Sequence, residues 1–474
     1  MSLDPQIIRE LEQIVGQKYC RSDQEARLTH SYDATPLFQS FPHAIIYPQN
    51  TEEIQAIMKV ANTYQIPVIS RGSGTNLSAS TVPVQGGVVM VFSRMNKILE
   101  IDTKNLTATV QPGVITKDLH EAVSDHFLFY PPDPGSMSIS TIGGNIAQGA
   151  GGLRGLKYGT TKDYVLGLKA VLANGELIQT GGKLTKDVAG YDVTKLLVGS
   201  EGTLAIITEA TLKLLPKPNF QQTMVACFPN LDFAAEAVSE IISARMIPCT
   251  LEFMDQGTMK VVEEFTQIGL PTDQKAMLIL EQDGPREVVE NDLKRMAEIC
   301  RRLQATKIEI AHTEEERELL LEARRTALSA LARSTATTIL EDATVPRASI
   351  PQMVRKITEI SKKYNILICT FGHAGDGNLH PTCMTDARDK EEIERVKKAF
   401  AEIFETALKL GGTITGEHGV GLAKASYMEK QWGKAGIRLL KRIKDAFDPH
   451  HLLNPGKIFP PSEEESSWTN GMIR

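Results

Sequence analysis

The segment that most restricts the fold is a glycine-rich stretch at residues 131–159, which reads PPDPGSMSISTIGGNIAQGAGGLRGLKYG. A flexible Gly/Ser linker would lack the isoleucines that are threaded between the hydroxyl groups, at Ile139, Ile142 and Ile146. A solvent loop of this length with few charges is uncommon inside a compact domain. The stretch therefore predicts extended backbone that lies against a large ligand, with N–H groups and small hydroxyls facing a polar group such as a pyrophosphate.

A small α/β unit precedes this stretch. Asn50 predicts the N-cap of an amphipathic helix, and residues 66–69 read as a strand that runs into the sequence RGSGTN at residues 71–76. Such a loop is either an ordinary glycine turn or an anion-binding loop, and the residues alone leave both open. Further along, Asn174 and Gly175 predict a hairpin with a type I′ turn.

Beyond Pro216 and Pro218, which mark a domain boundary, strand-like runs alternate with helical stretches. This order is typical of an α+β domain with helices on one face of a sheet. Residues 313–332 predict one long helix that carries Arg324 and Arg325. The pattern alone favours a solvated helix face on which these arginines pair with glutamates.

The sequence FGHAGDGNLHP, at residues 371–381, follows an apolar run that reads as a short buried strand. It holds His373 and His380 among glycines, which let the backbone turn sharply. These residues make it a candidate metal or acid–base site, although two histidines at this spacing can also be structural. A further histidine occurs in the sequence GEHG at residues 416–419.

Composition argues against several classes of function. The chain has 52 Lys and Arg against 58 Asp and Glu, so its formal charge of -6 offers no electrostatic footprint for nucleic acid. No apolar run approaches the roughly 20 residues of a membrane span, and the polar start is unlike a signal peptide. The six cysteines form no CxxC pair, which argues against a zinc knuckle or a cysteine-ligated cluster. Free thiols in the cytoplasm are the expectation.

Six motifs occur in a fixed order along the chain: RGSGTN, PPDPGSMSISTIGGNIAQGAGG, VGSEGTLAIITEATLKLLPKP, GHAGDGNLHP, GEHGVG and NPGK. Together they resemble the FAD-linked oxidases of the vanillyl-alcohol oxidase fold, in the branch of the glycolate oxidase FAD subunit and D-lactate dehydrogenase. The resemblance covers residues 5–460. It implies an α+β fold with a two-part FAD-binding domain of the PCMH type at 1–218, a substrate (cap) domain at 219–415 and a C-terminal segment at 416–474 that returns to the flavin.

The resemblance also implies which residues bind FAD. Residues 71–76 would wrap the pyrophosphate, and the residues named below between 132 and 152 would line the flavin and its chain. Glu201, Gly202 and Ile206 would contact the adenosine side. Asn454 would close over the isoalloxazine. The implied residues are Arg71, Gly72, Ser73, Gly74, Thr75, Asn76, Pro132, Asp133, Gly135, Ser136, Thr141, Gly143, Gly144, Asn145, Gly152, Glu201, Gly202, Ile206 and Asn454.

For the substrate side, the resemblance implies a divalent metal (Zn, Mn or Fe) on His373, His380 and Glu417, with His418 as the catalytic base. Asn378 and Arg324 match substrate-binding positions. The implied reaction is oxidation of a small 2-hydroxy acid to the 2-oxo acid with hydride transfer to flavin N5. The residue types suit it, because arginine has a planar fork for a carboxylate and imidazole can take a proton near neutral pH. A metal would lower the pKa of the hydroxyl.

Three departures from the family pattern refine this picture. Family members that bind the flavin covalently often carry a histidine in the loop that matches residues 71–76. This loop contains none, so the resemblance implies non-covalent FAD. Leu340 and Glu341 stand where a dicarboxylate would need a lysine, which favours glycolate or D-lactate over D-2-hydroxyglutarate. Leu321 replaces a usual tryptophan, which leaves Arg325 as the alternative to Arg324.

The electron acceptor and other partners stay open at this point. The resemblance implies separate iron–sulfur subunits, or a quinone or cytochrome, and is compatible with a homodimer. The expected location is cytoplasmic, with peripheral contact at the inner membrane face through partners. Two other functions remain as alternatives: a catalytically silent flavin-fold subunit, and an enzyme that oxidises an aryl ether or alcohol without a metal.

Overall fold

The computed structural model describes residues 3–459, and its chain divides into two units that we describe separately. Among the described residues, the first unit comprises 3–150, 160–217 and 417–459, and the second comprises 151–159 and 218–416. Residues 460–474, the end of the expected C-terminal segment, lie outside the described residues. Within residues 3–459, no helix combines the length and the apolar character needed to cross a membrane.

The first unit begins with a four-stranded sheet in the order β1-β2-β4-β3. Strands β2, β4 and β3 run parallel, as the strand–helix–strand reading of this region requires. Asn50 accepts a hydrogen bond from the N–H of Glu53 at 2.8 Å, so the predicted N-cap is confirmed. The elements are α1 (Pro5–Val15), β1 (Cys20–Arg21), α2 (Gln24–Thr29), β2 (Ala44–Ile46), α3 (Thr51–Tyr64), β3 (Val68–Arg71) and β4 (Val88–Val91).

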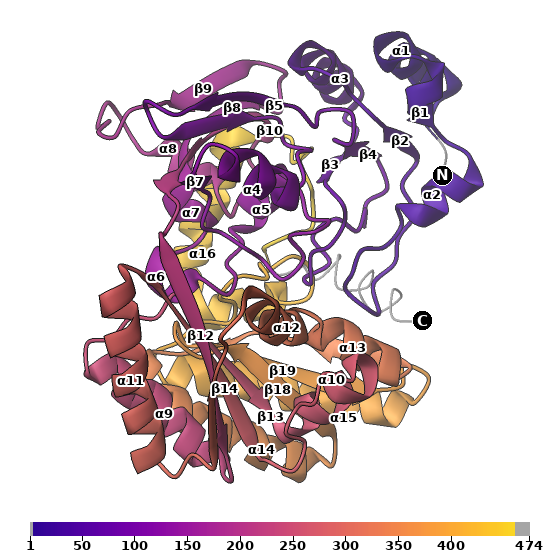
Figure 1. The fold of residues 1–474 in the computed structure, drawn as a ribbon. Helices are drawn as coiled ribbons and strands as arrows, with labels where there is room; N and C mark the ends of the chain where they lie inside the picture. Colours follow the sequence, from indigo (N-terminus) through magenta and orange to yellow (C-terminus); the bar gives the residue numbers. More distant parts are fainter. Residues whose placement is uncertain (1–2, 460–474) are drawn as a thin grey trace. The chain divides into compact units, whose positions relative to one another are not determined.

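A second, five-stranded antiparallel sheet follows in the order β5-β6-β10-β8-β9 (Figure 1). The predicted hairpin is present, but the type I′ turn is wrong, because Gly175 has a positive φ of 86° and Asn174 does not. The Asn174 side chain instead accepts from the N–H of Glu176, which holds a three-residue loop. The strands are β5 (Ile98–Asp102), β6 (Thr107–Val110), β8 (Val165–Val171), β9 (Leu177–Gly181) and β10 (Ile206–Lys213).

The sequence predicted extended backbone along the glycine-rich stretch at residues 131–159. The structure shows that only part of it is extended. Its centre forms helix α5 (Ile142–Gln148), because Thr141 caps the N–H of Gly144 and Ile142 and Ile146 are buried one turn apart. The remaining elements of the unit are α4 (Thr116–Ser124), β7 (Leu128–Phe129), α7 (Thr161–Tyr164), α8 (Val193–Leu197), β11 (Leu215–Pro216) and α16 (Met428–Phe447).

The second unit is built on an eight-stranded sheet in which every recorded pair is antiparallel. Its order is β15-β12-β14-β13-β18-β19-β16, with β17 paired to β19. The strands are β12 (Phe220–Phe228), β13 (Thr250–Asp255), β14 (Ala276–Gly284), β15 (Lys307–Ile310), β16 (Thr337–Leu340), β17 (Ala343–Thr344), β18 (Leu367–His373) and β19 (Asn378–Thr385).

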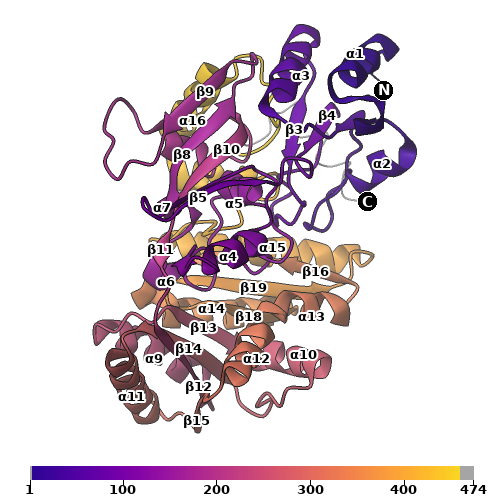
Figure 2. The ribbon, with the colours of Figure 1, turned by 45° about the horizontal axis from the view of Figure 1, so that its top comes forward.

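Helices cover both faces of this sheet, so the expectation of helices on one face is wrong (Figure 1; Figure 2). Helix α14 contacts α9 and α15, and α9 contacts α11, whereas α12, α13 and α10 form another contacting group. The expected single helix at 313–332 is two helices that meet at Thr326. The helices are α6 (Gly155–Tyr158), α9 (Leu231–Ser243), α10 (Gln256–Thr266), α11 (Arg286–Arg302), α12 (Glu314–Arg325), α13 (Ala327–Ser334), α14 (Ile350–Tyr364) and α15 (Lys390–Lys409).

Candidate active site

The loop at residues 71–76 has the features of an anion-binding loop. The backbone N–H groups of residues 72–76 find no hydrogen-bond acceptor among residues 3–459. Arg71 itself points into the unit, where its Nη1 donates to the carbonyl of Tyr32 at 2.8 Å and to Thr81 Oγ1 at 3.0 Å. Burial lowers the pKa of Arg71. Its side chain therefore braces the base of the loop, and the unpaired N–H groups are the part suited to a phosphate.

Gly72 sets how closely this loop approaches helix α5. A Cβ atom on Gly72 would lie 2.3 Å from Thr141 Oγ1, the atom that caps the helix. We expect Gly72→Ala to cost about 1–3 kcal/mol by overpacking and to weaken FAD binding accordingly. Titration of the apoprotein with FAD measures this, and the thermal midpoint of the apoprotein separates loop distortion from loss of the fold. Unchanged FAD affinity would show that the loop does not need this close approach.

The residues near α5 that the resemblance assigned to FAD are mostly brought together in the first unit. Asn145 Nδ2 donates to Thr116 Oγ1 at 2.7 Å, and a Cβ on Gly143 would meet Pro112 at 2.5 Å. Asp133 is buried, and the carbonyl of Pro132 lies 2.9 Å from a ring nitrogen of His120. Gly135 and Ser136 lie in the turn that precedes the helix, and Gly144 lies in its first turn, whereas Gly152 belongs to the second unit.

Glu201 holds the C-terminal part of the first unit in place. Its carboxylate accepts from the N–H groups of Val420 at 2.6 Å and Gly421 at 2.7 Å, and from Ser80 Oγ at 3.0 Å. Burial raises the pKa of Glu201, and these donors oppose that rise. Val420 is two residues beyond His418, so Glu201 fixes the backbone that carries the predicted base. Glu201 thus contacts the His418 segment within this unit.

Asn454 completes the network beside Glu201. Its Nδ2 donates to the carbonyls of Ser80 at 2.9 Å and Glu201 at 2.7 Å, while its buried Oδ1 has no hydrogen-bond partner among the described residues. Gly202 has a φ of 68°, and Ile206 is buried at the start of β10. A buried amide oxygen without a partner and a loop of unpaired N–H groups fit a polar, phosphate-bearing cofactor such as FAD.

A cluster of buried polar residues lies in the second unit, on one face of β13, β18 and β19. Glu252 Oε1 is 2.7 Å from His373 Nδ1, and the ring centroids of His373 and His380 are 5.0 Å apart. Residue 373 pairs with Asn378 across the β18–β19 hairpin, so these side chains share a face. The stretch at 371–381, expected as a loop after a strand, is therefore the tip of this hairpin with both histidines inside strands.

Arg324 joins this cluster from helix α12. Its Nε donates to Glu252 Oε2 at 2.5 Å, and its guanidinium carbon lies 4.7 Å from the ring centroid of Phe371. The residue is only 5% exposed, yet its two terminal nitrogens find no acceptor among residues 3–459. Arg325 instead lies 3.8 Å from Glu318. The solvated-face reading is therefore wrong for Arg324, whose partner is a buried acid 72 residues away in sequence.

Glu252 is fully buried, and its carboxylate is negatively charged beside His373 and Arg324. Burial raises its pKa, but the adjacent His373 and Arg324 outweigh that effect, so the pKa of Glu252 is lowered. A buried carboxylate with two such partners is ionised at neutral pH. Sequence reasoning missed Glu252, and the available signal was a glutamate inside the otherwise apolar strand TLEFM.

Asn378 and His380 are each held by a neighbour in the same unit. Thr344 Oγ1 donates to Asn378 Oδ1 at 2.7 Å, which turns the amide nitrogen the other way. His380 Nδ1 lies 3.4 Å from Asp342 Oδ1, and the other oxygen of Asp342 accepts from Thr415 Oγ1 at 2.7 Å and from the N–H of Gly416 at 3.1 Å. Asp342 thereby ties Thr415 and Gly416 to the strand that carries His380.

Asp342 and His380 of the second unit supply part of the donor set of a metal site. A carboxylate oxygen of Asp342 and an imidazole nitrogen of His380 lie 3.4 Å apart. Glu417 and His418 directly follow in sequence Gly416, whose N–H group donates to Asp342. Imidazole with carboxylate ligands suits Zn, Mn or Fe. Asp342 was not among the expected ligands.

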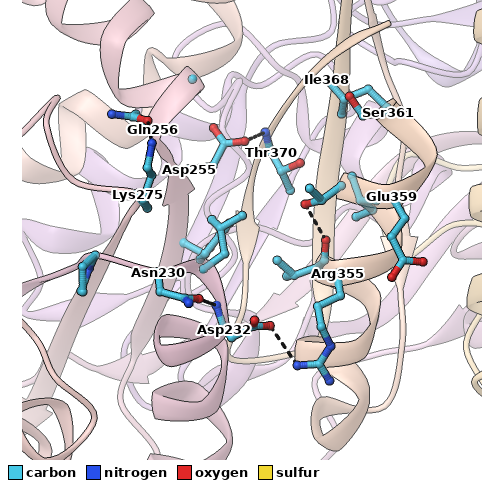
Figure 3. Close-up of a pocket in the computed structure, with 17 residues that line it drawn as sticks. Asn230, Asp232, Asp255, Gln256, Lys275, Arg355, Glu359, Ser361, Ile368 and Thr370 are labelled. Carbon is cyan, nitrogen blue, oxygen red and sulfur yellow. Dashed lines mark hydrogen bonds and ion pairs between the residues drawn. The ribbon is translucent and has the colours of Figure 1, made fainter. Parts of the chain in front are cut away.

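A cavity of about 550 Å³ lies elsewhere in the second unit (Figure 3). Phe253 and Thr370 line it, and they face away from Glu252 and His373 because side chains alternate along a strand. Its polar groups pair with one another, as in the ion pair of Arg355 with Asp232 at 2.9 Å. This cavity is therefore separate from the candidate active site.

Comparison with known proteins agrees with this description. Residues 42–181 match the FAD binding domain, and residues 217–458 match the FAD linked oxidases, C-terminal domain. The chain is 59% identical to the glycolate oxidase subunit GlcD of Bacillus subtilis (strain 168), over 95% of this chain and 96% of that protein. It is 37% identical to a D-lactate dehydrogenase of Archaeoglobus fulgidus, over 87% of this chain and 90% of that protein.

Solved structures support the fold. The structure of p-cresol methylhydroxylase with substrate bound superposes with a TM-score of 0.80 at 17% identity and covers 96% of each chain. A 4-ethylphenol oxidase from Gulosibacter chungangensis gives a TM-score of 0.79 at 20% identity and covers 97% of each chain. The expected α+β fold class, with a PCMH-type FAD-binding domain, is confirmed.

Proposed function

The chain belongs to the FAD-linked oxidases and is an FAD-dependent oxidoreductase. From that premise we propose that it oxidises a small 2-hydroxy acid, glycolate or D-lactate, to the 2-oxo acid. The observation that carries the proposal is the buried Arg324, whose terminal nitrogens lack an acceptor. A cation of this kind in a buried site fits a carboxylate. The names of the relatives supply the class of substrate.

The expected site residues take separate roles in the proposed chemistry. In the second unit, Arg324 binds the substrate carboxylate and Asn378 orients the substrate through the amide end that Thr344 leaves facing away. In the first unit, His418 removes the hydroxyl proton. FAD, when bound, supplies the hydride acceptor at N5, and we expect it to be dissociable.

The proposed metal site involves His373, His380 and Glu417, with Asp342 as a further candidate ligand. The carboxylate of Asp342 and the imidazole of His380, 3.4 Å apart, support a divalent ion at this position. Such an ion would lower the pKa of the substrate hydroxyl and make proton removal by His418 easier. Partners for reoxidation are proposed to be iron–sulfur subunits, or a quinone or cytochrome.

The charge of the residues near the substrate should determine whether the protein prefers a monocarboxylate or a dicarboxylate. Glu341 directly precedes Asp342, and a second substrate carboxylate would need a cation in this region. We therefore favour glycolate or D-lactate, with D-2-hydroxyglutarate as the alternative. A catalytically silent subunit is the other alternative, and the buried, fully assembled group around Glu252 and His373 counts against it.

Anaerobic stopped-flow spectroscopy with a panel of acids tests this function. The yellow holoprotein should bleach with glycolate or D-lactate, and at least about tenfold faster than with D-2-hydroxyglutarate, because binding a dicarboxylate here leaves a charge unpaired. Bleaching with D-2-hydroxyglutarate alone would select the alternative substrate. If none of the three acids reduces the flavin, the substrate class is wrong.

A further inference from the structure

Glu252 lies between the groups that the proposed function assigns to the metal and to the substrate. One carboxylate oxygen is 2.7 Å from His373 Nδ1, and the other is 2.5 Å from Arg324 Nε. The side chain is completely buried on β13. A single acid therefore touches both a predicted metal ligand and the predicted substrate anchor.

We propose that Glu252 is a positioning residue that supports both metal binding and substrate binding, by fixing the tautomer of His373 and the orientation of Arg324. The proposal rests on the proposed function and goes beyond it, because it assigns a role to a residue outside the expected site. Glu252 acts through its two neighbours and does not itself contact the substrate.

The tautomer of His373 follows from the chemistry of its partner. A carboxylate offers only hydrogen-bond acceptors, so the Nδ1 atom that faces Glu252 must carry the proton. In the neutral ring, the form that binds a metal, the lone pair then lies on Nε2. Carboxylate–histidine pairs of this kind orient metal-binding histidines in general, and their loss typically weakens metal binding about 10–100-fold.

The orientation of Arg324 follows in the same way. Its Nε is committed to Glu252, and Phe371 lies against its planar group, so the direction of the terminal fork is fixed. The fork consists of the two nitrogens that lack an acceptor among residues 3–459. A fork held in advance loses little conformational freedom when a carboxylate binds.

An amide in place of the Glu252 carboxylate can satisfy only one of the two partners. In Glu252→Gln, the single oxygen should turn to the permanently charged Arg324, which leaves the NH₂ group facing His373. His373 Nδ1 must then accept, so the proton moves to Nε2 and the lone pair for the metal is lost. If the oxygen turns to His373 instead, the NH₂ group opposes the Nε–H of Arg324 and the fork is displaced.

The neighbouring strand provides a matched control. Glu281 on β14 is also buried, and it binds Arg317 at 3.0 Å, seven residues before Arg324 on the same helix. The two pairs are alike in burial and chemistry, but the recorded side-chain partners of Glu281 are Thr223, Cys249 and Arg317. Glu281→Gln should therefore lower stability without changing metal or substrate binding.

The experiment compares wild type, Glu252→Gln and Glu281→Gln as FAD-loaded proteins. Zinc affinity is measured by competition with a chelator, and the dissociation constants of glycolate and D-lactate are measured from anaerobic flavin reduction. The protonated nitrogen of His373 is read in metal-free protein by ¹⁵N NMR with labelled histidine, and His373→Gln assigns the signal. FAD content and thermal midpoint report whether each variant folds.

We expect Nδ1 protonation in wild type and Nε2 protonation in Glu252→Gln, with zinc binding about 10–100-fold weaker and weaker substrate binding in that variant alone. Unchanged zinc affinity and tautomer in Glu252→Gln, or equal losses in Glu281→Gln, would overturn the proposal. So would a wild-type His373 protonated on Nε2, a result that needs no variant. The tautomer and zinc affinity are read without turnover, so failure of every acid to reduce the wild-type flavin would defeat the proposed function alone.

Discussion

Replacing His418 with alanine is expected to slow reduction of the flavin by the 2-hydroxy acid about 10²–10⁴-fold while FAD stays bound. The reason is that the substrate hydroxyl then loses the imidazole that takes its proton, and water replaces it poorly. Single-turnover reduction, followed at the flavin absorbance, measures the step directly. The dissociation constant of FAD should stay within about twofold, because no predicted FAD contact is removed.

We expect the backbone around residue 418 to be unchanged by this substitution. Glu201 binds the N–H groups of Val420 and Gly421, so the segment should keep its path without the imidazole. His451, which is exposed and pairs with Asp445 at 3.1 Å, provides the control, and His451→Ala should reduce the flavin at the wild-type rate. A wild-type rate in His418→Ala would remove this residue as the base.

Local signals predicted the local structure well. The cap at Asn50 and the hairpin around Gly175 depend on residues within a few positions of one another, and both are present. The turn type failed because the Asn174 side chain accepts from the backbone N–H of Glu176, two residues on, a choice that the dipeptide alone does not reveal. Helix α5 was missed because its single cap at Thr141 is hidden among other hydroxyls and glycines.

Only part of the site could be predicted, because some of its contacts join residues that are far apart in the sequence. The motifs marked the histidines at 373 and 380, but they could not show that Glu252 lies beside them, because β13 and β18 are paired across more than a hundred residues. The same distance in sequence concealed the partner of Arg324. A glutamate at i+4 is visible in a sequence, whereas a buried acid on another strand is not.

Replacing Arg324 with lysine is expected to raise the dissociation constant of the 2-hydroxy acid about 10²-fold or more, with FAD binding unchanged. Lysine keeps the charge, but its single ammonium group cannot bind Glu252 and present a planar fork to the substrate at once. Losing a charged hydrogen bond to a substrate carboxylate costs about 2–4 kcal/mol, which corresponds to this range. The concentration dependence of anaerobic flavin reduction measures the dissociation constant.

Arg317 on the same helix separates this effect from a general loss of stability. Its guanidinium is fully engaged, with Glu281 at 3.0 Å and Glu314 at 2.6 Å, so it has no fork left for a ligand. Arg317→Lys should lower the thermal midpoint and leave substrate binding unchanged, since only the packing of α12 is affected. Equal weakening of substrate binding in both variants would show that Arg324 acts through the helix. Wild-type affinity in Arg324→Lys would remove it as the carboxylate anchor.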